Sequence, residues 1–274
     1  MSAANTVLRT IDLCRVITEY QIGITQDSLV FRVFNDEACE TLLSDAIPAI
    51  LSLLEKSQAI FSTWYQAVAL SRLKNVLELM PPIRYIALYD SAYNNRLDAL
   101  KTVHQLYRME YSCENLLNLT ACNGSLECLK FLVEKGYEGL TSRSIDGAAE
   151  QGHLDVVKYL HEQCQIEETT AAMDLAATNG HFNVVQYLQM NCEEGSTMAA
   201  MNNAATNGYL VIVQYLHKHR HRASHEAMNR AAANGHLDIV KFLHKHRNEG
   251  YTQRALEEAK AHNHQDIVAY LTCN

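Results

Sequence analysis

The sequence predicts an all-α fold, a solenoid of stacked helical hairpins. One segment recurs along the chain at a nearly constant spacing, which is typical of repeat architectures. Within each copy the apolar residues follow helical periodicity. The 11 Gly and 3 Pro of the 274-residue chain are too few for an all-β sandwich or barrel, whose many short strands need frequent turns.

The recurring segment is clearest in residues 148–160, which read AAEQGHLDVVKYL. The segment returns in residues 176–188, 204–216 and 231–243, and in more divergent form around Gly124, Asn263 and Asn95. The glycines of the four clear copies are 28, 28 and 27 residues apart. About seven repeats are therefore predicted over residues 84–274.

Each repeat is expected to contain two short helices. Hydroxyl residues that can cap a helix start occur in register at Thr141, Thr169, Thr197, Ser224 and Thr252. In the first helix, Met173, Ala176 and Ala177 share one face, and Gly180 follows as the positive-φ residue that ends it. Residues 182–189 are the expected second helix, whose apolar surface is wide enough to need cover from more than one side.

Stacking explains why these hairpins occur in tandem. A single hairpin cannot bury its own apolar surface, but a row of them can, with each one contacting only its neighbours. The paired alanines of the first helices allow adjacent helices to approach closely.

The signature A-A-x-N-G-H-L-x-V-V-x-Y-L resembles the ankyrin repeat, whose A-A-x-x-G-H-x-x-V-V-x-x-L stretch is matched almost residue by residue in residues 148–160, 176–188 and 231–243. More narrowly, the chain is similar to the short ankyrin-like arrays of oomycetes and of giant viruses of amoebae, which share the H-x-x-R-x-E-G-x-T linker of residues 244–252. The resemblance covers residues 84–274. It implies a protein-binding scaffold without enzymatic activity.

The chain departs from the ankyrin pattern in two ways. The T-P-L-H tetrapeptide is absent, and its His position carries Asp146, Asp174, Asn202, Asn229 and Glu257. These side chains either bond to the backbone of the neighbouring repeat or are solvated. The period is also about five residues shorter than the usual 33. We therefore expect the β-hairpin fingers of the family to be reduced to tight loops or absent.

Both ends of the array are expected to be caps. In residues 251–274, Lys260 replaces the second alanine and Gln265 replaces an apolar residue, as a C-terminal cap requires. Residues 1–80 are expected to form a helical N-terminal cap or small divergent domain, with helices over residues 40–54 and 58–80. The pair Pro81-Pro82 precedes the first repeat.

Composition and charge bound the location and the partners. The net charge of -8 and the pI of about 5.9 disfavour a general nucleic-acid binder. No apolar run approaches a membrane span, and no secretory signal is visible. The eight cysteines contain no C-x-x-C pair, and Cys164 and Cys192 are expected to be free thiols. These features predict an intracellular protein, cytoplasmic or nuclear.

No catalytic motif is recognisable. The chain lacks a phosphate-binding P-loop, an H-E-x-x-H zinc helix and a G-x-S-x-G elbow. The histidines after each turn glycine, His153, His181 and His236, are interpreted as structural residues at the start of the second helices. The sequence therefore predicts no enzyme, no cofactor and no metal site.

A basic ridge is a second candidate site. It combines two clusters 27 residues apart, with cations at Lys218, Arg220, Arg222, Lys245 and Arg247. The histidines among them can bind zinc, but they lie in polar linkers with competing cations, which disfavours a metal site. The ridge either meets a phosphate, RNA or an acidic protein, or is a solvated edge.

The first helices are expected to line a concave surface that binds a partner protein. Its predicted contact residues are Glu150, Gln151, Leu175, Thr178, Asn179, Asn203, Thr206, Asn207 and Arg230, with Gly147 and Ala233 also exposed. The protein is expected to be a monomer that binds another protein and no membrane. Three alternatives remain: a ubiquitin-ligase adaptor acting through residues 1–80, a phosphate- or RNA-binding ridge over residues 217–247, and an enzyme with a pocket where the N-terminal region meets the repeats.

Overall fold

The computed structural model describes residues 47–67, 73–79, 83–107, 114–167, 169–192 and 194–273, and every regular element among them is an α-helix. The chain divides into two compact units. Unit 1 comprises residues up to 120 together with 127–139, and unit 2 comprises residues 121–126 and 140–274. The boundary between the units falls within residues 84–274.

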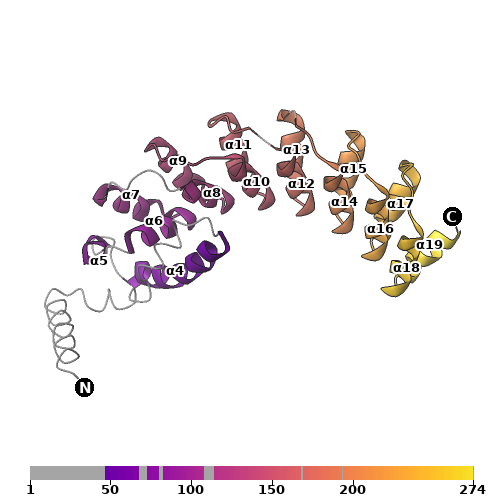
Figure 1. Ribbon diagram of the computed structural model, residues 1–274, viewed down its shortest axis with the longest axis horizontal. Helices are drawn as coiled ribbons and strands as arrows, with labels where there is room; N and C mark the ends of the chain where they lie inside the picture. Colours follow the sequence, from indigo (N-terminus) through magenta and orange to yellow (C-terminus); the bar gives the residue numbers. More distant parts are fainter. Residues whose placement is uncertain are drawn as a thin grey trace, which may run out of the picture. The chain divides into compact units, whose positions relative to one another are not determined.

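Unit 2 is a row of five helical hairpins in the region that the structure describes. Their helices are α10 (Ser142–Glu150), α11 (Leu154–Glu162), α12 (Thr170–Thr178), α13 (Phe182–Asn191), α14 (Met198–Thr206), α15 (Leu210–Lys218), α16 (His225–Ala233), α17 (Leu237–His246), α18 (Gln253–Ala261) and α19 (Gln265–Cys273). Each first helix packs on the next first helix, and each second helix packs on the next second helix (Figure 1). The predicted all-α solenoid is confirmed.

Capping residues set the helix bounds where the sequence predicts them. Thr169, Thr197 and Ser224 each accept a hydrogen bond from the backbone N–H two residues later, at 3.1, 3.0 and 3.2 Å. The turn glycines have positive φ, for example +82° at Gly180. Asn263, at the same place in the last hairpin, adopts φ 61°, because asparagine tolerates this region.

The core of unit 2 consists mainly of small side chains from the first helices and branched ones from the second. Ala176, Ala177, Ala204 and Ala205 are completely buried. Their methyl groups let α12 and α14 pack closely. The Val and Leu residues of the second helices, such as Val185, cover the other side of this layer.

A ladder of polar side chains joins successive first helices. The side-chain oxygens of Asp174, Asn202 and Asn229 accept hydrogen bonds from the backbone N–H groups of the next capping residues, Thr197, Ser224 and Thr252, at 2.9, 3.2 and 3.0 Å. The predicted bonding to the neighbouring repeat is confirmed at these three positions. The links between the hairpins are short and contain no strand among the described residues. The β-hairpin fingers of the family are therefore absent from the described links, as expected from the short period.

Ring stacking on the turn glycines joins the hairpins at the opposite end. A Cβ added to Gly208 would lie 2.8 Å from the ring of His236, which belongs to the next hairpin. The His236 ring also hydrogen-bonds through Nε2 to the Thr206 carbonyl at 3.0 Å. The rings of His153 and His181 lie over the preceding glycines in the same way. These contacts confirm that the repeated histidines are structural.

Unit 1 contains a further hairpin-like pair before the repeats. Its described helices are α4 (Ile47–Ala67), α5 (Leu73–Leu79), α6 (Ile83–Tyr93), α7 (Leu97–Leu106), α8 (Glu114–Cys122) and α9 (Leu126–Glu134), of which α8 and α9 cross the boundary with unit 2. Helix α4 packs on α6 and α5 packs on α7, as the helices of one hairpin pack on the next. The predicted helix break at residues 55–57 is wrong. Ser57 is buried there, where it donates hydrogen bonds to Leu54 and Asp90.

Candidate functional site

The exposed side of α10, α12, α14, α16 and α18 forms one continuous row, which we call the first-helix face (Figure 1). The predicted contact residues lie at the exposed or half-buried positions of these helices or at their C-terminal caps: Glu150, Gln151, Leu175, Thr178, Asn179, Asn203, Thr206, Asn207 and Arg230. Helical periodicity predicted these positions, because the neighbouring hairpins bury the apolar side of each first helix and leave the opposite side accessible.

Several polar residues of the first-helix face bond to one another across hairpins. Asn203 donates to the hydroxyl oxygen of Thr178 at 3.1 Å, and Asn207 donates to the Thr178 carbonyl at 2.7 Å. Thr178 and Thr206 donate to carbonyls in their own helices. These bonds hold the side chains in fixed orientations, so part of the entropy cost of binding is already met in the free protein.

The centre of the face, on α12 and α14, is uncharged apart from Asp174 of the ladder. Ala171 and Leu175 on α12 and Ala199 on α14 are half-buried, and Met198 at the start of α14 is 48% exposed. Such a surface of small apolar groups and oriented amides is suited to contact with a folded protein or a peptide.

The C-terminal end of the face carries an ion-pair network that the sequence analysis missed. Glu226 pairs with Arg230 at 2.9 Å, and Arg254 pairs with Glu258 at 3.1 Å and with Glu226 at 3.9 Å. The hydrogen bond from Arg230 is the main cause that lowers the pKa of Glu226. Two i,i+4 pairs of opposite order, 28 residues apart, are the sequence signal for this network.

Gly147 is not an exposed contact position, contrary to the sequence-based expectation. An added Cβ at Gly147 would lie 2.0 Å from the Sγ atom of Cys122. The residue is a packing glycine that makes room for this side chain. The space next to Gly147 is occupied by Cys122 at the end of α8, and helical periodicity alone does not reveal such a neighbour.

The predicted basic ridge is only partly available for binding. Lys218, Arg220, Arg222 and Lys245 are exposed at the ends of α15 and α17. Arg247, in contrast, pairs with Glu249 and donates to the His221 carbonyl at 3.1 Å, so it ties two linkers together. The other four side chains remain exposed to solvent.

Three histidines of this region, His217, His221 and His244, are half-buried and contact neighbouring side chains. His217 lies edge-on to Phe242 at 5.4 Å between ring centroids, and burial lowers its pKa. His221 hydrogen-bonds to Ser196 at 2.7 Å and to Gln189. His244 bonds to the Tyr270 hydroxyl at 3.0 Å. Among the described residues no three His, Cys, Asp or Glu side chains are placed to hold a metal ion.

The cysteines offer no activated nucleophile in the described regions. Cys164 and Cys192 are free thiols, as predicted. Burial raises the pKa of Cys192 to about 11 and also raises the pKa of Cys164. Because the thiolate is the reactive form, these groups are chemically quiet at neutral pH.

Asp90 in unit 1 is a buried carboxyl group with a shifted pKa. Arg96 lies 2.8 Å away, and Ser57 and Asn94 donate hydrogen bonds to it. Burial raises the pKa from 3.8 to about 6, although these three partners all act to lower it. The cost of burying the carboxylate therefore exceeds the stabilisation that its partners provide. As a result, the folded protein is less stable when Asp90 is ionised than when it is protonated.

We expect the stability of unit 1 to fall as the pH rises through the titration of Asp90. The folded chain holds this proton more tightly than the unfolded chain, so the contribution is full below the unfolded pKa of 3.8 and is lost above about 6. Between pH 4.5 and 7 the free energy of unfolding should decrease by about 2 kcal/mol relative to the Asp90→Asn variant. Urea unfolding of both proteins across this range measures the difference, and a constant gap would contradict the assignment.

No described helix is long and apolar enough to cross a membrane. Residues 1–46 lie outside the described part of the chain, and with them most of the segment on which the ubiquitin-ligase adaptor alternative depends.

The geometry of unit 2 defines a class of protein, the helical-hairpin solenoids with short links. Comparison with protein families gives a more specific result, because the model for ankyrin repeats (3 copies) matches residues 145–222 and 201–274. Residues 145–274 therefore carry ankyrin repeats. No curated protein matches the chain. Ankyrin repeats are in general protein–protein interaction modules and typically act as scaffolds without catalysis.

Proposed function

We propose that this protein is a non-enzymatic scaffold that binds a partner protein on the first-helix face, the concave side expected from the sequence. One observation carries the proposal: the face is continuous over the hairpins of unit 2, and its central part is uncharged apart from the ladder and held in place by the hydrogen bonds between Asn203, Asn207 and Thr178. The ion pairs of Glu226 and Arg230 flank this centre. A centre with few charges and a charged edge agrees with the depletion of charged residues at the core of protein-binding surfaces.

Photo-crosslinking of the full chain tests the proposal. The crosslinking residue benzoylphenylalanine is placed at Leu175 on the first-helix face, or at the exposed Asn183 of α13 as a matched control on a second helix. In an extract of the source cell, a discrete protein adduct is expected at position 175 and none at 183. The same adduct should weaken at least about ten-fold when Ala199→Glu places a charge beside it, because central anchors dominate such interfaces.

The circular dichroism spectrum of each variant shows whether the helices are retained. Equal labelling at both positions, or labelling at position 183 alone, would move the binding surface to the second helices and contradict the proposal.

A further inference from the structure

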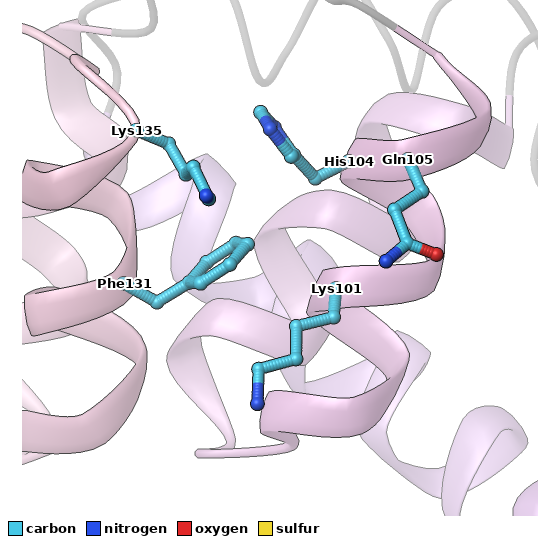
Figure 2. A pocket seen from close by; sticks show the side chains of 5 residues that line it. All are labelled: Lys101, His104, Gln105, Phe131 and Lys135. Atoms are coloured by element: carbon cyan, nitrogen blue, oxygen red, sulfur yellow. The ribbon is translucent and has the colours of Figure 1, made fainter.

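A cleft of about 450 Å³ lies in unit 1 between two second helices, α7 and α9. It is lined by Lys101, His104, Gln105, Phe131 and Lys135. Figure 2 shows Lys101, His104 and Gln105 of α7, Phe131 of α9, and Lys135, which directly follows α9, around the space between these helices. The cleft is built by residues of unit 1, whereas the first-helix face is built by helices of unit 2.

Aromatic contacts hold one end of the cleft in a fixed shape. The ring of His104 lies edge-on to Phe131, with ring centroids 5.5 Å apart. His104 also shares a hydrogen bond of 3.2 Å with the hydroxyl of Tyr137, whose ring is buried. These contacts position the half-buried ring of Phe131 as an apolar surface inside the cleft.

The charge of the described lining residues is positive. Lys101 and Lys135 contribute two ammonium groups, and none of the described lining residues is a carboxylate. Neither lysine forms an ion pair within the described part of the chain, whereas the nearby Lys130 is paired with Glu127 at 2.9 Å. The ammonium group of Lys135 lies 5.6 Å from the centre of the Phe131 ring, which keeps the charge next to the apolar surface.

We propose that this cleft binds a glutamate-rich segment of a protein partner. An aromatic surface beside two unpaired ammonium groups fits a side chain with an aliphatic stem and a terminal carboxylate. The methylene groups of a glutamate cover the exposed part of Phe131, and its carboxylate pairs with Lys101 or Lys135. The amide of Gln105 supplies a further hydrogen-bond donor. A second glutamate of the segment uses the other lysine.

Fluorescence anisotropy of the full chain with a fluorescein-labelled hexaglutamate peptide tests this site. Lys101→Gln and Lys135→Gln should each weaken binding by about three-fold, and the double variant by about ten-fold, as expected for partly exposed ion pairs. Lys130→Gln is the matched control, because it removes the same charge from α9, five residues before Lys135 and outside the cleft, and should leave binding unchanged.

Two further measurements distinguish the glutamate site from other sources of attraction. Inorganic phosphate at the same charge concentration should not displace the peptide, and a single-stranded RNA hexamer should bind more weakly than hexaglutamate. Phe131→Leu should weaken the peptide about two-fold while the helicity is unchanged. Equal loss in the Lys130→Gln control, displacement by phosphate, or tighter binding of the RNA would each overturn the proposal.

Discussion

Replacement of Gly208 by alanine is expected to lower the free energy of unfolding of unit 2 by roughly 3–4 kcal/mol. Gly208 has φ +82°, and an L-residue in this region costs about 1–2 kcal/mol. The new methyl group would also lie 2.8 Å from the His236 ring. Displacement of the ring breaks its hydrogen bond to the Thr206 carbonyl, which adds about 1 kcal/mol, and strains the packing around it.

Gly250→Ala is the matched control for this prediction. Gly250 also has positive φ, at +67°, but no atom lies within 4 Å of its added Cβ. The control should lose only the backbone contribution, about 1–2 kcal/mol. Urea unfolding followed by far-UV circular dichroism measures both variants. Equal losses would show that ring stacking on the glycine contributes nothing to the contact between hairpins.

Gly147→Ala should destabilise unit 2 by roughly 3 kcal/mol, although alanine is the better helix former. Glycine in the interior of a helix usually costs about 1 kcal/mol relative to alanine, so intrinsic propensity predicts a gain. Here the added Cβ would overlap the Sγ atom of Cys122, at a separation of 2.0 Å. The sign of the change therefore decides between helix propensity and packing.

A double-mutant cycle attributes this loss to a single contact. Cys122→Ala removes the sulfur atom and should cost about 1–2 kcal/mol by itself. The double variant Gly147→Ala/Cys122→Ala should lose clearly less free energy of unfolding than the sum of the two single losses, because the new methyl group then occupies the space of the sulfur atom. Thermal unfolding of the four proteins gives the coupling energy. A stabilised Gly147→Ala variant, or additive effects, would contradict the packing role.

The repeat pattern predicted the hairpins of unit 2 because the determinants of each one are local. The capping Thr169, the paired alanines and the positive-φ Gly180 all lie within one period and act on their own helices. The ladder residues Asp174 and Asn202 were also identified, since stacking at a fixed period brings equivalent positions together. Divergent copies were recognised for the same reason, because Asn95 and Asn263 are the other residue type that tolerates positive φ.

The candidate binding surfaces were predicted less well. Helical periodicity identifies which side of a helix is exposed in an ideal array, but it does not report what a neighbouring side chain fills. Gly147 was placed on the surface and instead packs against Cys122. Arg247 was placed on a basic ridge and instead pairs with Glu249. The cleft at Lys101 and Lys135 has no sequence motif, because its residues come from two helices of divergent repeats.

The sequence by itself determined that residues 145–274 form a row of helical hairpins of the ankyrin type, because the residues that start, end and stack each hairpin recur at one period. Tertiary structure alone decided which polar and charged side chains are free to meet a partner. Whether a side chain is free to contact a partner depends on distances of a few ångströms to residues of neighbouring hairpins, as for Asn203 with Thr178 or Glu226 with Arg254. Such distances arise only when the hairpins have packed together.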